Sequence, residues 1–345
     1  MNRSPLRTLL AIACGLLCAV LLGACGGSGS DEKPSARETL QQTLDRSTRG
    51  IERGRLNATF RLDPEGLLKL GGPIGVRVSG PFAAPTRGSL ARFDLGFLAT
   101  LAGQRFSGAA ISTGRRSFVR LDNRAYAIDD ADVAKLRRQA RGAAADPRAA
   151  LRSLGINPVR WITNPRRAGE AQVGGVDTER ITGTVNVRQL LADVGALLEK
   201  AGGGGTSVLT PEMRNRIAGA VKSSKVDVWT GADDRLLRQI AVAVSFAFDQ
   251  GEPSPIPGLD GGRISLRVRL DDVNGRPVRI AAPAGARPLP RLTGEGGLSR
   301  FVQGIAAGLT GGIGPGQPGA ALLRCITQAG GSSVRVVDCV SKLAP

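Results

Sequence analysis

The sequence contains no histidine among its 345 residues. A Ser-His-Asp triad, a Cys-His nucleophile pair and the usual zinc site all need that side chain, so these centres are excluded. The phosphate-binding pattern GxxxxGK[ST] is also missing, and the glycines at 311, 312, 314 and 316 do not follow a predicted strand, as a dinucleotide fingerprint requires. The sequence therefore predicts a protein that is not an enzyme and uses no cofactor.

Cysteine is scarce, and its positions suggest one disulfide. Cys14 and Cys18 lie in an N-terminal apolar segment and Cys25 follows it, which leaves Cys325 and Cys339. Two thiols in an oxidising compartment most simply pair with each other, and closing a loop of about 15 residues contributes ~3 kcal/mol to stability. The pair alone is not expected to bind a metal, since no third cysteine lies nearby.

The two clusters of carboxylates are explained by local structure. Asp129, Asp130 and Asp132 precede a predicted helix, where aspartate caps free N–H groups and favours the helix dipole. Asp233 and Asp234 fall in a predicted hairpin turn, which aspartate also favours. Neither cluster has the spacing of an EF-hand, so no metal site is predicted.

The sequence lacks an apolar run long enough to span a bilayer. The run from Leu9 to Leu22 has 14 residues, or ~21 Å of helix against a hydrocarbon core of ~30 Å. With Arg3 and Arg7 before it, the run is typical of a signal peptide over residues 1–24. Leu22-Gly23-Ala24-Cys25 resembles the lipobox of bacterial lipoproteins, which implies that Cys25 is acylated and anchors the protein to the extracytoplasmic face of the cell membrane. The alternative is an ordinary secretory signal with a cysteine there by chance.

The chain is strongly basic, with a formal net charge of +18. Outside the cytoplasm this charge favours an anionic membrane or glycolipid surface, or it is simply a solvated basic surface. Nucleic acid is not an expected partner, because the chain is exported and its few aromatic residues do not interleave with basic clusters.

Period-two alternation of apolar and polar residues dominates the rest of the chain. After a flexible tether at 25–35 and a helix from Ser35, about eleven strands are expected, with one apolar face and one charged face. This is typical of an antiparallel sheet packed on one side. The clearest segments are 55–62, 74–79, 92–97, 105–113, 116–121, 124–128, 176–185, 225–230, 236–248 and 263–270.

Helices and loops are expected between these strands and after them. Helices are predicted at 131–141, 146–154, 187–201 and 211–222, and a loop around 161–165. A linker begins at 283–290, and the tail from 291 to 345 reads as short helices joined by the disulfide.

One strand has a bulky apolar face and a small-residue face. Ile240, Val242, Val244, Phe246 and Phe248 alternate with alanines and a serine. Such a strand suits a curved sheet, with one side lining an apolar space and the other lying against something close. The predicted lining residues are Leu56, Phe60, Ile74, Val76, Phe93, Phe97, Ile240, Val242, Val244, Phe246, Ile264, Leu266 and Val268. The alternative is that helices from the middle of the chain fill this face and make it an ordinary core.

Three sequence segments, together with Cys25 and its Gly/Ser tether, resemble a known protein family. They are the segment from Val173 to Val185, Val226-Asp227-Val228-Trp229 with its Asp233/Asp234 turn and Leu237-Arg238, and Leu270-Asp271-Asp272-Val273-Asn274 before Pro277-Val278 and Ile280. With them, residues 36–290 resemble the actinobacterial LppX/LprAFG lipoproteins, whose fold is like that of the periplasmic carriers of the Lol pathway.

The resemblance implies an α+β, LolA-like fold in which a half-open antiparallel barrel wraps over helices. It further implies that a lipid or glycolipid lies in the apolar space, with basic residues on the rim meeting anionic headgroups. The tail at 291–345 has no counterpart in the simple carriers. The alternative is a structural or protein-interaction envelope lipoprotein with a closed core and no ligand.

Overall fold

The computed structural model describes residues 34–66, 72–86, 89–101, 103–131, 133–134, 137–138, 158–193, 211–249, 259–288, 318–340 and 342. The described helices and strands belong to one compact unit, Ala36–Pro345. The signal peptide, Cys25, most of the tether, residues 146–154 and 194–201 and the glycines at 311–316 lie outside the described residues.

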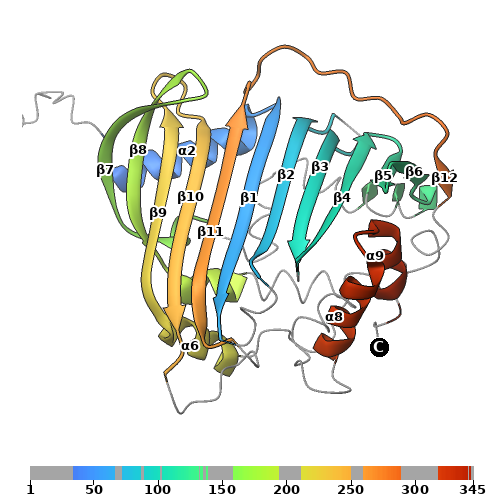
Figure 1. Ribbon diagram of the computed structural model, residues 1–345. Coiled ribbons are helices and arrows are strands. Elements are labelled where there is room, and N and C mark those ends of the chain that lie inside the picture. Colours follow the sequence, from blue (N-terminus) through green and yellow to red (C-terminus); the bar gives the residue numbers. More distant parts are fainter. Residues whose placement is uncertain are drawn as a thin grey trace, which may run out of the picture. The chain divides into compact units, whose positions relative to one another are not determined.

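A single twelve-stranded sheet forms the centre of this unit (Figure 1). Its order is β12-β6-β5-β4-β3-β2-β1-β11-β10-β9-β8-β7. The strands are β1 Arg53–Glu65, β2 Ile74–Ala83, β3 Arg92–Leu101, β4 Gln104–Thr113, β5 Ser117–Leu121, β6 Arg124–Ala127, β7 Ile162–Val173, β8 Val176–Val185, β9 Val221–Gly231, β10 Leu237–Ala247, β11 Gly261–Asp271 and β12 Arg287–Pro288.

The sheet consists of two meanders that meet at its middle. Strands β1 to β6 run outward in sequence order, β7 to β11 run back inward, and the antiparallel β1–β11 pair joins the two halves. All neighbouring pairs are antiparallel except the parallel β12–β6 pair. The predicted α+β class with a large, curved antiparallel sheet is confirmed, and the structure adds β7 and β12 to the expected strands.

The helices are few and short, and those predicted within the described residues are present, but the helix expected at 211–222 ends at Gly219 and Val221 already begins β9. The helices are α2 Ala36–Gly50, α6 Pro211–Gly219, α8 Pro318–Ala329 and α9 Ser333–Val340, with a 3-10 helix η2 at Pro158–Trp161. Residues 187–193 are also helical, as expected. No helix in the described ranges is both long and apolar enough to cross a membrane.

Strand register separates the two faces of the sheet. Paired residues in neighbouring strands share a face, and one row runs through Ile181, Val228, Ile240, Val268, Ala58 and Val78. We call this apolar side the inner face. The next row along the strands, from Asp227 through Ala241, Arg267 and Thr59 to Arg77, lies on the opposite side, the outer face.

Helix α2 covers the inner face at the β7 end of the sheet, where Figure 1 shows it lying across the strands. Leu40 is 1% exposed and packs in a cluster with Ile162, Ile181, Val226 and Val228. Burial of one such side chain contributes about 1.5 to 3 kcal/mol, so this contact holds the helix on the sheet.

The C-terminal helices cover the same face at the other end. Leu322 and Ile326 of α8 pack with Phe106 of β4, and Val337 of α9 packs with Leu121 of β5. The predicted disulfide between Cys325 and Cys339 joins the two helices, with 5.6 Å between the Cα atoms. The tail therefore contributes to the core of the unit.

Two other sequence expectations are wrong. The loop expected around 161–165 is the end of η2 and the start of β7. Bulges between Thr163 and Arg166 and between Arg167 and Glu170 break the alternation that would have predicted a strand there. The small-residue side of β10 was expected to lie against another segment, yet Ala243 on that side is exposed.

Candidate functional site

All of the predicted lining residues lie on the inner face of the sheet. The register brings together residues that are distant in sequence: Phe60 faces Val76 on one side and Leu266 on the other. Leu56, Ile74, Phe93, Phe97, Ile240, Val242, Val244, Phe246, Ile264 and Val268 occupy the same face on β1, β2, β3, β10 and β11.

These residues differ in how far they are covered. Val244 and Phe246 are each 8% exposed, and Phe246 packs with Ala220 and Leu259 at the α6 end of the sheet. Ile240 and Val242 pack against the α2 cluster, and Phe97 against the α9 cluster. These positions are therefore part of the core between the sheet and its helices.

The middle of the inner face is only partly covered. Phe60, Leu266 and Val268 are half-buried, and Val76 is 37% exposed. We call these four residues the central strip; they lie on β1, β2 and β11, between the strands that α2 covers and the strands that α8 and α9 cover. Because the four apolar side chains are neighbours on paired strands and stay partly exposed, together they leave a surface that can still bury apolar groups of a ligand.

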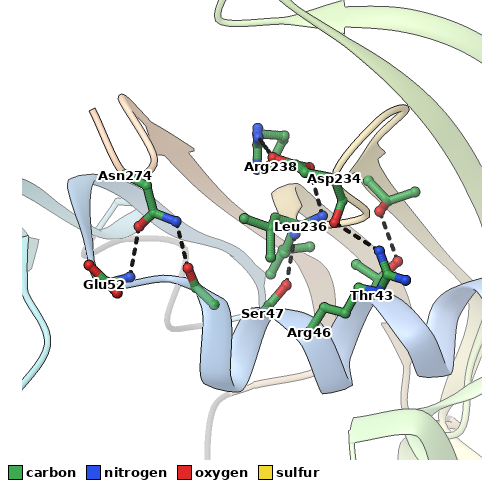
Figure 2. Close-up of polar contacts among 11 residues, drawn as sticks. Thr43, Arg46, Ser47, Glu52, Asp234, Leu236, Arg238 and Asn274 are labelled. Atoms are coloured by element: carbon green, nitrogen blue, oxygen red, sulfur yellow. Dashed lines mark hydrogen bonds and ion pairs between the residues drawn. The ribbon is translucent and has the colours of Figure 1, made fainter.

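Polar contacts fix the C-terminal half of α2 on the rim of the sheet (Figure 2). The Ser47 hydroxyl accepts a hydrogen bond from the backbone N–H of Leu237 at 2.8 Å, and the Thr43 hydroxyl donates to Thr230 at 2.8 Å. Asn274 accepts from the N–H of Glu52 at 2.8 Å and donates to the carbonyl of Gly50. Together these bonds tie α2 and the residues just after it to the ends of β9, β10 and β11.

The β9–β10 turn is held in the same region. The Asp234 carboxylate accepts from the N–H of Leu236 at 2.9 Å and forms an ion pair with Arg238. This is the turn role that the sequence predicts for Asp234. An open pocket of about 510 Å³ between this turn and α2 is lined by Gln42, Asp45, Arg46, Arg49, Gly50, Asp234 and Leu236. Its charged lining makes it unsuitable for an acyl chain.

A second polar cluster lies beneath α2. Glu179 forms ion pairs with Arg167 and Arg235, and Arg167 also donates to the hydroxyl of Thr39 at 3.2 Å. The cluster joins β7, β8 and the β9–β10 turn to the helix. The sequence segments that resemble the family contain four of these residues: Glu179, Asp234, Arg238 and Asn274. These segments therefore help to position α2 over the sheet.

Among the described residues, Asp129 and Asp234 have the capping and turn roles that the sequence predicts. Asp129 caps a helical turn, where its carboxylate accepts from the N–H of Ala131 at 2.7 Å, as the sequence predicts. In the described part of the chain, no group of three or more Cys, Asp or Glu side chains is arranged to hold a metal ion. The central strip is the candidate site because its apolar side chains remain partly exposed, and its chemistry is apolar burial.

No protein-family model and no curated protein matches the chain. Among solved structures, LprF from Mycobacterium bovis aligns over 75% of this chain and 100% of its own, with 16% identity and a TM-score of 0.38. LppX from Mycobacterium tuberculosis aligns over 72% and 100%, with 16% identity and a TM-score of 0.36. The MucA/MucB complex of Pseudomonas aeruginosa aligns over 76% of this chain and 62% of that one, with 12% identity and a TM-score of 0.22. LprF and LppX are both mycobacterial, and this chain is similar to each of them over that protein's full length, while its own sequence segments resemble the LppX/LprAFG lipoproteins.

Proposed function

We propose that this protein binds a lipid or glycolipid on the inner face of its sheet and carries or presents it in the cell envelope. The observation that carries the proposal is the central strip, where Val76 is 37% exposed on an otherwise half-buried apolar face. The binding mechanism is burial alone, and no residue acts as a catalyst.

The energy of such binding comes from the acyl chain. Each buried CH₂ group contributes ~0.8 kcal/mol, so eight of them contribute about 6 kcal/mol before the costs of association. The neighbouring strands β1 and β11 supply the apolar side chains of Phe60, Leu266 and Val268. These side chains give the acyl chain of the lipid a continuous surface to lie on. The fixed position of α2 sets one boundary of that surface.

A matched pair of substitutions tests the proposal. Val76 on the inner face and Leu98 on the outer face are 37% and 39% exposed and lie on the adjacent strands β2 and β3. We expect Val76→Glu to weaken binding of a dansyl-labelled fatty acid at least about tenfold, because the glutamate places a charge where the acyl chain of the fatty acid would be buried. Leu98→Glu should leave the dissociation constant unchanged.

Fluorescence titration of the unit Ala36–Pro345 measures both constants, and circular dichroism confirms that the variants fold. If the unchanged protein takes up no fatty acid, or if both variants weaken binding equally, the carrier proposal is wrong. The structural alternative, a closed core without a ligand, then stands.

We further propose that Cys25 is acylated and holds the protein at the extracytoplasmic face of the membrane. Stable anchoring needs two acyl chains or more, which a lipobox cysteine would supply. We expect Cys25→Ser to move the chain from the membrane fraction to the soluble fraction of cells. A variant that stays with the membrane after a salt wash would contradict the anchor.

A further inference from the structure

The outer face of the sheet carries an open groove of about 430 Å³, on the side opposite the proposed lipid site. We call it the outer groove. Its lining comes from β1, β2, β9, β10 and β11; the outer-face residues are Thr59, Arg77, Lys225, Asp227, Ala241, Ala243, Ser265 and Arg267, and the groove is also bordered by Val242 and Leu266, whose register puts their side chains on the inner face.

Strand register explains why a groove forms here. Ala241 and Ala243 of β10 and Ser265 of β11 are small, so the floor between the longer side chains is low. Arg77 and Arg267 both face Thr59, one from each side of β1. Their backbones are therefore two strand spacings apart, about 10 Å, and both side chains line the same groove.

The two arginines are available for a ligand. Both are exposed, and within the described part of the chain neither makes an ion pair or a side-chain hydrogen bond. Their neighbours on the same face differ, since Arg61 pairs with Asp63 and Arg269 pairs with Asp271. Arg77 and Arg267 thus lie on either side of one hydroxyl without an ion-pair partner among the described residues.

The carboxylate in the groove wall is already neutralised. Asp227 is 8% exposed, and its oxygens lie 2.9 Å from Arg180 and 3.2 Å from Lys225. Burial opposes its ionisation, but hydrogen bonds from Thr182, Arg180 and Lys225 outweigh this and hold the pKa of Asp227 below its ordinary value. Three cations line the groove against this one carboxylate, so its net charge is positive.

We propose that the outer groove binds a phosphate ester, with Arg77 and Arg267 as the main ligands. A guanidinium group presents two parallel N–H donors that match phosphate oxygens, and the hydroxyls of Thr59 and Ser265 add donors from the floor. A groove between two cations suits a discrete phosphate group. The phosphate could belong to a free ester or to a lipid headgroup, because the recognition chemistry is the same.

Calorimetry on the unit Ala36–Pro345 tests this site with inorganic phosphate and glycerol 3-phosphate at low ionic strength. We expect binding that weakens as salt is added. The double variant Arg77→Gln/Arg267→Gln should bind at least about a hundredfold more weakly, or about tenfold for each charged hydrogen-bond donor removed. The control Arg324→Gln/Arg335→Gln removes the same charge from exposed positions on α8 and α9 and should keep the affinity.

Vesicles distinguish the two sources of phosphate. Binding to vesicles of phosphatidylcholine with phosphatidylglycerol, without binding of free esters, would assign the site to a lipid headgroup if only the Arg77/Arg267 variant loses it. If no probe binds, or if the control variant loses as much affinity as the groove variant, the proposal is overturned. The outcome is independent of the lipid-carrier proposal, since fatty-acid binding is measured on the other face with Val76→Glu.

Discussion

The side chain of Asp122 joins the β5–β6 turn to the last helix of the chain. It stands in the left-handed region with φ of 48°, next to Asn123 with φ of 61°, as a tight hairpin turn requires. Its carboxylate accepts hydrogen bonds from the N–H of Ser333 at 2.8 Å and of Val334 at 3.2 Å. Asp122 thus caps the start of α9, whose first residue, Ser333, lies 211 positions further along the sequence.

Acid should weaken this cap. Burial opposes ionisation of Asp122, but hydrogen bonds from Ser332, Ser333 and Val334 outweigh it and lower the pKa of the carboxyl group below 3.8. A group with a lowered pKa stabilises the fold above its unfolded pKa, and this stability is lost as the pH falls through the folded pKa. We therefore expect Asp122→Ala to lower the free energy of unfolding by about 0.5 to 2 kcal/mol at pH 7, and by less at pH 3.

Thermal unfolding of both proteins at pH 7 and pH 3 measures the effect. Asp122→Asn is the control, because it keeps an oxygen acceptor and the turn preference but cannot titrate. A gap between the Asp122 protein and the Asp122→Ala variant that is the same at both pH values would rule out the charge as its cause.

Helix α2 is the element on which the inner face depends. Its apolar side packs on β7 to β10, and its C-terminal end is fixed by the β9–β10 turn and by Asn274 after β11. Asn274 also has φ of 58°, which favours asparagine or glycine at that position. The residue therefore supplies both a backbone conformation and the hydrogen bonds that close the end of the helix.

Asn274→Gly should separate these two contributions. Glycine keeps the backbone conformation and removes the bonds to Glu52 and Gly50, so we expect the free energy of unfolding to fall by about 1 to 2 kcal/mol. Urea denaturation measures this loss. Asn274→Ala should cost more, because it adds strain at a positive φ, and equal stability of the two variants would contradict this role.

The elements that the sequence predicted well are those with local signals. Alternation over residues 55–62 and 263–270 predicted β1 and β11, and Gly or Asp residues marked the turns between strands. Strand β7 was missed because Asn164 and Gly169 adopt positive φ at its bulges and break the period of two. Sequence also could not show that α2 and α8–α9 cover the two ends of one face, because that depends on packing between distant segments.

The middle of the sheet, from β2 to β10, separates two chemistries, whereas at β4 and β5 the outer face is covered by an apolar cluster that includes Ile111 and Phe118. The predicted apolar residues do share the inner face, as alternation implied, but which of them are closed into the core and which form the central strip depends on where the helices lie. The outer groove was not predicted, because its lining residues come from five strands and meet only through the register. An apolar inner face and a cationic outer face would let one domain bury an acyl chain and bind phosphate independently.

The central claim is that the inner face holds an acyl chain. The most direct test is native mass spectrometry of the unit Ala36–Pro345, purified without detergent, before and after extraction with organic solvent. We expect bound acyl species that disappear on extraction and return when lipid is added, with less lipid bound by Val76→Glu than by Leu98→Glu. A single mass for the unliganded protein that does not change when lipid is added would contradict it.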